Sequence, residues 1–206
     1  MISYEKGNIT VIEAGDKIRI TKGKYSYHCD LNNGEAVILP LTYGDGEYIL
    51  SIYQRIKGTT YRLLKKRTVS ASGTFEYLSQ YNTYVPFTTA SKTAQMVAKG
   101  MDEHGAYKAI RKWVQRSIVY DFIKAATVGK GAIPDPQACF DKRMGICQDI
   151  ASLAVSMMRS VGIKSRLVIG NADGKYHAWA EALIGWKVYR FDYSGSAKSY
   201  VRERWY

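Results

Sequence analysis

The strongest constraint on the fold is a change in the spacing of apolar residues along the chain. Up to about residue 70 apolar and polar residues alternate, as in "KIRIT" and "KYSYHCD", and this alternation predicts β-strands. From about residue 88 apolar residues return every three or four positions, which predicts helices. Strands followed by helices and then more strands favour an α+β fold.

The 206 residues are enough for one large domain or two small ones with cores of their own. We expect an N-terminal all-β module over residues 1–72, a small antiparallel sheet structure resembling a β-sandwich. A second domain is expected over residues 73–206. The segment 71–88 has no clear period and is interpreted as a linker packed on the surface.

Three helices are expected in the second domain. Thr88 or Thr89 caps the first, and Asp102 caps the second. The third begins after Ile146 and ends at Gly162. One face of the third helix is apolar and contains Ile150, Leu153, Ala154, Met157, Met158 and Val161. The later stretches "KSRLVIG", "YHAWAEALI" and "KVYRFDY" predict strands.

Cys147 lies at the start of the third helix. The unpaired N–H groups of the first turn and the positive end of the helix dipole favour a thiolate over a thiol at this position. The same N–H groups could stabilise a developing oxyanion. The position therefore suits a nucleophile that faces the sheet under the helix, with an inert buried cysteine as the alternative.

A nucleophilic thiol needs a base, and the base needs an orienting group. His177 lies in an alternating strand, and Asp192 lies in the next one. If Ile184-Gly185 forms a two-residue turn, His177 and Asp192 are side by side across the hairpin, whereas a three-residue loop makes them diagonal neighbours. The residues thus predict a catalytic triad of Cys147, His177 and Asp192.

These motifs resemble the core of the transglutaminase-like superfamily. The resemblance rests on "GICQD" at the helix start, "YHAWAEALI" with its His-Ala-Trp strand, and "VYRFDYS" with its aspartate, and it covers about residues 100–195. It implies a papain-like core of helices packed on an antiparallel sheet. It also implies that Cys147 is the nucleophile, His177 the base and Asp192 the orienting group. The stretch after Asp192 departs from the family pattern because it lacks an Asp-Pro-Thr ending.

The resemblance implies amide chemistry through a thioester intermediate, on peptide or protein substrates and without a cofactor. A peptidase or amidase is the first hypothesis, and a protein-glutamine transamidase that crosslinks its substrates is an alternative. A further alternative is a non-catalytic binding protein that uses its basic β module. Hydrolysis and transamidation differ in which nucleophile reaches the thioester, which the sequence leaves open.

Other polar residues are assigned structural roles. Asp149 is interpreted as an acid that stabilises the helix dipole, and Tyr120 as a packing residue in preference to an oxyanion donor. Three dispersed cysteines and three histidines predict neither a disulfide framework nor a metal site. The residues interpreted as structural on these grounds are Cys29, Cys139, His28 and His104.

The chain carries a net charge of +12. Segment 55–67 contains six basic residues and no acid, and it is interpreted mainly as a solvent-facing hairpin that resists edge-to-edge pairing. The alternative is a docking surface for an anionic cell-wall polymer. Nucleic acid is not expected as a partner, because the positive charge is the only feature of the sequence that favours it. No apolar run is long enough for a membrane span. The N-terminus lacks signal-peptide features, so we expect a cytoplasmic protein, or an extracellular one if a leader is missing.

Overall fold

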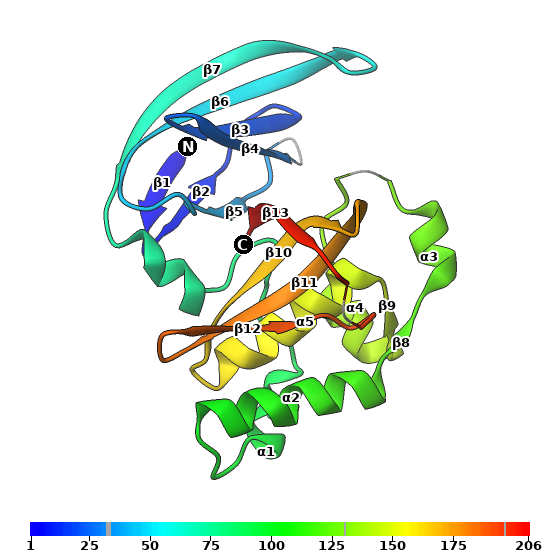
Figure 1. The fold of residues 1–206 in the computed structure, drawn as a ribbon. Coiled ribbons are helices and arrows are strands. Elements are labelled where there is room, and N and C mark those ends of the chain that lie inside the picture. Colours follow the sequence, from blue (N-terminus) through cyan, green and yellow to red (C-terminus); the bar gives the residue numbers. More distant parts are fainter. Residues whose placement is uncertain (32–33, 130, 196) are drawn as a thin grey trace. The chain divides into compact units, whose positions relative to one another are not determined.

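Two compact units, Met1–Tyr77 and Leu78–Tyr206, make up the chain in a computed structural model (Figure 1). The structure describes residues 1–31, 34–129, 131–195 and 197–206. Residues 1–72, expected to form the N-terminal module, fall within the first unit.

The first unit contains two antiparallel sheets. The smaller has the strand order β1-β2-β5, and the larger has the order β4-β3-β6-β7. Their strands are β1 (Ile2–Glu5), β2 (Asn8–Val11), β3 (Lys17–Lys22), β4 (Tyr25–Asp30), β5 (Val37–Pro40), β6 (Gly46–Lys57) and β7 (Thr60–Ala71).

The larger sheet has one apolar and one polar face. Ile18 and Ile20 of β3 are fully buried, whereas Arg19 between them is exposed. Leu50 of β6 pairs with Ile20 and is buried on the same face. This alternation is the pattern from which strands were predicted, and the N-terminal antiparallel module is confirmed.

The interpretation of residues 71–88 as a surface linker is wrong. The segment includes a short 3-10 helix, η1 (Thr74–Ser79), and then runs along a helix of the second unit. Tyr84 and Val85 are almost completely buried, and the Tyr84 carbonyl accepts a hydrogen bond from Ser152 Oγ at 2.7 Å. The Tyr84 ring stacks on that of Tyr206 with centroids 3.9 Å apart. Each of these residues is buried by its own separate contact. The buried positions therefore do not follow the regular spacing of a helix or a strand.

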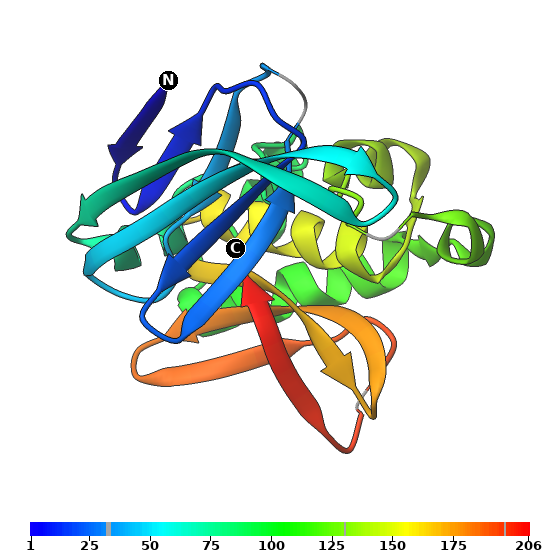
Figure 2. The same cartoon turned by 90° about the horizontal axis from the view of Figure 1, so that it is seen from above.

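The second unit packs helices on an antiparallel sheet, as predicted. The sheet has the order β12-β11-β10-β13, and the short strands β8 and β9 form a separate parallel pair. Figure 2 shows β13 in red at the edge of the sheet, beside β10. Within the described ranges, no helix is both long and apolar enough to cross a membrane. The elements are α1 (Ser91–Val97), α2 (Glu103–Ser117), β8 (Val119–Tyr120), α3 (Phe122–Thr127), α4 (Pro136–Lys142), β9 (Met144–Gly145), α5 (Cys147–Ser160), β10 (Lys164–Ala172), β11 (Lys175–Ile184), β12 (Lys187–Phe191) and β13 (Tyr200–Trp205).

Helix α5 is the centre of this unit. It packs against β10 and β11, and almost all of its residues are buried (Figure 1). Even the charged Arg159 is buried, with 6 % of its surface exposed. Its guanidinium is satisfied there because it donates hydrogen bonds to the carbonyl oxygens of Ser165, Gln80 and Tyr206. Through Arg159 the helix is therefore bonded to Gln80, near the start of the unit's sequence, and to Tyr206 at its end.

The predicted helix starts agree only in part with the structure. Asp102 caps α2 by accepting a hydrogen bond from the Gly105 N–H at 2.7 Å, as expected. Neither threonine caps α1, whose N-cap is Ala90. Thr88 is instead buried, with its hydroxyl 3.2 Å from Ser156 Oγ. Helices α3 and α4 and strands β8, β9 and β13 were not predicted.

We expect Gly170→Ala to destabilise the second unit. A Cβ at this position would lie 2.0 Å from the backbone oxygen of Val201, so β13 would have to move away from β10. Overpacking of this kind costs about 1–3 kcal/mol, which lowers the melting temperature by about 3–10 °C. Thermal unfolding followed by circular dichroism measures the change. Gly129→Ala is the control, since nothing lies within 4 Å of its Cβ, and equal melting temperatures for the two variants would contradict the prediction.

Candidate active site

Cys147 is the first residue of α5 and is 9 % exposed. The preceding Ile146 has extended backbone angles and no side-chain acceptor, so it cannot cap the helix itself. The Asp149 carboxylate instead accepts the Ile146 N–H at 3.2 Å. The helix start that carries the thiol is therefore capped by Asp149, a residue of the first turn of the same helix.

Asp149 has a larger role than the helix-dipole acid that was expected. Its side chain is completely buried, and Oδ2 lies 2.5 Å from Lys124 Nζ of α3. Its Oδ1 accepts the backbone N–H of Asp135, which precedes α4, at 2.9 Å. One carboxylate thus joins the starts of α4 and α5 to α3, so the earlier interpretation of Asp149 was incomplete.

The structure brings His177 and Asp192 together. His177 Nε2 lies 2.9 Å from Asp192 Oδ1, and both side chains are largely buried, with 14 % and 4 % of their surface exposed. The Cys147 side chain is among the neighbouring groups that raise the pKa of the His177 ring. The predicted three residues are therefore neighbours in space.

The predicted register of the hairpin is wrong. Ile184 pairs with Lys187, so the turn consists of Gly185 and Trp186 instead of Ile184 and Gly185. His177 lies beyond the end of the β11–β12 pairing, opposite Gly170 of β10, and Asp192 follows the last residue of β12. The register is displaced by two residues, which leaves every side chain on the same face of the sheet. The two side chains therefore still meet.

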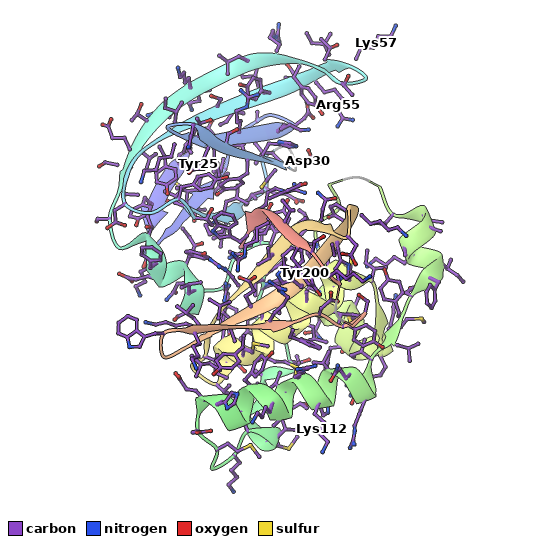
Figure 3. The ribbon with its side chains drawn as sticks, in the orientation of Figure 1. Tyr25, Asp30, Arg55, Lys57, Lys112 and Tyr200 are labelled. Atoms are coloured by element: carbon purple, nitrogen blue, oxygen red, sulfur yellow. The ribbon has the colours of Figure 1, made fainter. Side chains whose placement is uncertain are left out.

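Asp192 is held by neighbours that sequence reasoning missed. Its Oδ1 accepts hydrogen bonds from the Ser194 N–H at 2.9 Å and from Ser194 Oγ at 2.8 Å. Its Oδ2 accepts one from the Tyr200 hydroxyl at 2.8 Å. Tyr200 begins β13 and is labelled in Figure 3. The Arg190 guanidinium covers its ring at 3.7 Å from the centroid. The β-branched and aromatic residues of "YVRERW" are a signal in the sequence that could have identified this strand.

The electrostatics of the pair favour a charged imidazole. Burial lowers the pKa of His177, but hydrogen bonds to Asp192 and Cys147 outweigh it and raise the pKa to about 9. Burial raises the pKa of Asp192, but the hydrogen bonds from His177, Ser194 and Tyr200 bring it below its usual value. At neutral pH the pair is an imidazolium beside a carboxylate.

Tyr120 of β8 lies beside the thiol. Burial raises the pKa of its hydroxyl, and the Cys147 side chain acts in the same direction. Tyr120 therefore stays protonated at neutral pH, near the start of α5.

A cleft of about 370 Å³ opens on the histidine side of the site. His177, Asp192 and Ser194 line it, together with Asp173 and Tyr176. The Tyr176 hydroxyl donates to Gln148 Oε1 at 3.2 Å, which links the cleft wall to the residue after Cys147. The cleft is partly polar and borders the imidazole of His177.

The other cysteines do not extend the site. Cys29 and Cys139 are buried thiols, and burial, followed by the nearby Asp149 charge, raises the pKa of Cys139 to about 12. Within the described ranges, no group of three or more His, Cys, Asp or Glu side chains is arranged to hold a metal ion.

Comparisons with known proteins connect this unit to one family. The model of the transglutaminase-like superfamily matches residues 90–193, which contain all three predicted site residues. The "Uncharacterized protein ML0607" of Mycobacterium leprae is 27 % identical over 125 residues. That match covers 54 % of this chain and 43 % of the relative, so the chain spans less than half the length of this relative.

Among solved structures, a "Putative Cysteine Protease" from Cytophaga hutchinsonii shares the fold. It superposes with a TM-score of 0.56 at 16 % identity, over 96 % of this chain and 78 % of the other. The periplasmic domain of TgpA from Pseudomonas aeruginosa has a TM-score of 0.47 at 13 % identity, covering 89 % of this chain and 90 % of that domain. The first of these likenesses extends over both units of the chain.

We expect Asp192→Asn to return the pKa of His177 from about 9 toward its ordinary 6.5, because the carboxylate that favours the imidazolium is gone. A raised folded-state pKa stabilises the fold fully below pH 6.5, and this contribution disappears as the pH rises through 9. Asp192→Asn should therefore lower stability at pH 6 more than at pH 9.5. NMR titration of the three imidazoles measures the pKa, with His177→Gln identifying the signal. A wild-type pKa near 6.5 would contradict the prediction.

Proposed function

Because the chain belongs to the transglutaminase-like superfamily, we propose that it is a cysteine hydrolase that cleaves amide bonds of peptides or proteins. Cys147 is the nucleophile, His177 the general acid and base, and Asp192 the orienting group. The observation that carries the proposal is the contact of His177 Nε2 with Asp192 Oδ1 at 2.9 Å, at a histidine whose pKa is also raised by the side chain of Cys147 at a helix start.

The first half of the reaction forms a thioester. The thiolate sulfur attacks the carbonyl carbon, and the negative charge moves to the carbonyl oxygen, where N–H groups at the start of α5 stabilise it. When the tetrahedral intermediate collapses, the carbon–nitrogen bond breaks, and the His177 imidazolium gives its proton to the departing amine. Ammonia or an amine leaves, and the acyl group stays on Cys147.

The second half releases the acyl group. Neutral His177 removes a proton from water, and the resulting hydroxide attacks the thioester carbon. The carbon–sulfur bond breaks, a carboxylic acid leaves, and the imidazolium–thiolate pair forms again. The polar cleft beside His177 supports water as the acceptor, since polar residues such as Asp173 and Ser194 line it together with His177.

We expect Cys147 to react with iodoacetamide at pH 6, and His177→Ala to slow this reaction about tenfold or more. His177 is cationic at pH 6 because its pKa is about 9, and a cysteine beside a cationic imidazole is a stronger nucleophile at this pH than an isolated thiol. Rates measured by peptide mass spectrometry from pH 5 to 10 should converge above pH 9, where His177 is neutral.

The controls for this experiment lie in the same unit. His104→Ala removes a histidine whose ring lies tilted against that of Tyr189, with centroids 4.9 Å apart, and it should leave the rate unchanged. Buried Cys139, whose pKa is about 12, should stay unlabelled. If Cys147 is no more reactive than Cys29, the catalytic proposal fails and a non-catalytic binding protein becomes the better hypothesis.

The acceptor is tested separately. With a substrate peptide in H₂¹⁸O and a competing primary amine, a hydrolase yields products with one ¹⁸O in the new carboxylate. We expect this outcome, and Cys147→Ser should abolish it. Predominant amine incorporation would identify a protein-glutamine transamidase instead, with the same nucleophile but a site that excludes water.

A further inference from the structure

A second cavity lies in the first unit, on the polar face of the larger sheet. It has a volume of about 250 Å³ and is lined by Lys17, Arg19, His28, Tyr53 and Tyr61. These residues come from all four strands of that sheet. Since Ile18 and Ile20 fill the core, the alternation of β3 directs Lys17 and Arg19 to the opposite face, where the cavity opens.

The strand register aligns basic side chains across this face. His28 of β4 pairs with Arg19 of β3, Arg19 pairs with Ser51 of β6, and Ser51 pairs with Lys66 of β7. Directly paired residues share a face, and neighbouring strands lie about 4.8 Å apart. His28, Arg19 and Lys66 are exposed, while the small Ser51 is buried between the two cations. A row of basic groups thus crosses the sheet.

The cavity has an excess of positive charge. Its lining includes no carboxylate. Lys17 Nζ lies 3.6 Å from Asp30 Oδ1 at the end of β4, in a pair that remains open to solvent. Among the described residues, no carboxylate lies within 4.0 Å of the Arg19 guanidinium. The Arg19 charge is therefore not neutralised by a direct ion pair there.

Tyr61 forms a fixed wall of the cavity. Arg55 Nε and Nη2 donate to the Tyr61 hydroxyl at 3.2 and 3.0 Å, and Lys17 Nζ lies 4.7 Å from the ring centroid. Figure 3 shows Arg55 and Asp30 at the same end of this sheet. Lys17 chiefly, and then Arg55, hold the pKa of Tyr61 below its usual value. A lowered phenol pKa is the response expected from a positive local potential.

We propose that this cavity binds a phosphate group. The ammonium of Lys17 and the guanidinium of Arg19, both from β3, and the imidazole of His28 from β4 line it. A phosphate has more charge and more acceptor oxygens than a carboxylate, so it suits such a group of donors better. The cavity is at the small end of ligand sites, so it takes a free phosphate or one phosphorylated sugar unit. This site is independent of the chemistry proposed for Cys147.

The test is calorimetric titration of the full chain at constant ionic strength, with inorganic phosphate, glucose 6-phosphate, acetate and glucose as probes. Both phosphates should bind with one site per chain, and acetate should bind at least about tenfold more weakly. Arg19→Gln should weaken phosphate binding about tenfold or more, the usual effect of losing one charge-assisted hydrogen bond. Tighter binding of glucose 6-phosphate identifies a phosphorylated sugar as the ligand, and equal binding identifies free phosphate.

The matched control is Arg62→Gln. Arg62 is an exposed arginine of β7 that donates to Gln54 Oε1 at 2.9 Å. It follows the cavity residue Tyr61 in the strand, so its side chain is on the opposite face of the sheet from the cavity. Its loss changes the net charge as Arg19→Gln does and should alter binding less than twofold. Arg19→Lys, which keeps the charge, should bind with intermediate affinity. The proposal is overturned if phosphate does not saturate one site, if acetate binds equally well, or if Arg19→Gln and Arg62→Gln lose affinity equally.

Discussion

The candidate site depends on the buried carboxylate of Asp149. A buried charge is costly unless it is paired and hydrogen-bonded, and this one is held by Lys124 and by the N–H groups of Asp135 and Ile146. The same contacts fix the backbone just before Cys147. This arrangement requires a glycine at position 145, because a Cβ there would lie 2.7 Å from Cys139 Sγ and 3.0 Å from the Asp149 Cβ. The thiol is thus positioned by its neighbours in the "GICQD" motif.

The other half of the site depends on the far end of the chain. Asp192 lies after the end of β12, where strand pairing no longer orients it. Ser194 and Tyr200 take over that task through hydrogen bonds to both carboxylate oxygens. Because Tyr200 begins β13, the pairing of β13 with β10 also sets the orientation of Asp192. A change at Gly170 in β10 would therefore reach the imidazole through the edge of the sheet.

Periodic and paired features could be predicted from the sequence, and irregular ones could not. The apolar face of α5 and the alternation of β10 to β12 define those elements. The His177–Asp192 contact tolerated a wrong register because a shift of two residues keeps every side chain on its face. The Gly185-Trp186 turn, the buried segment at Tyr84 and the hydrogen bond from Tyr200 depend on contacts between distant parts of the unit. Such contacts leave no regular spacing of apolar residues in the sequence, so these features were missed.

The proposed reaction makes opposite demands on His177, which must donate a proton in the first half and accept one in the second. Its raised pKa depends on two partners, Asp192 and the Cys147 side chain. Acylation turns Cys147 into a neutral thioester and removes one of them, while burial continues to oppose the imidazolium. The pKa of His177 therefore falls when the acyl group is attached, and the ring becomes a base at the stage that needs one. Asp192 holds the ring in place throughout, so the change of role requires no movement of the imidazole.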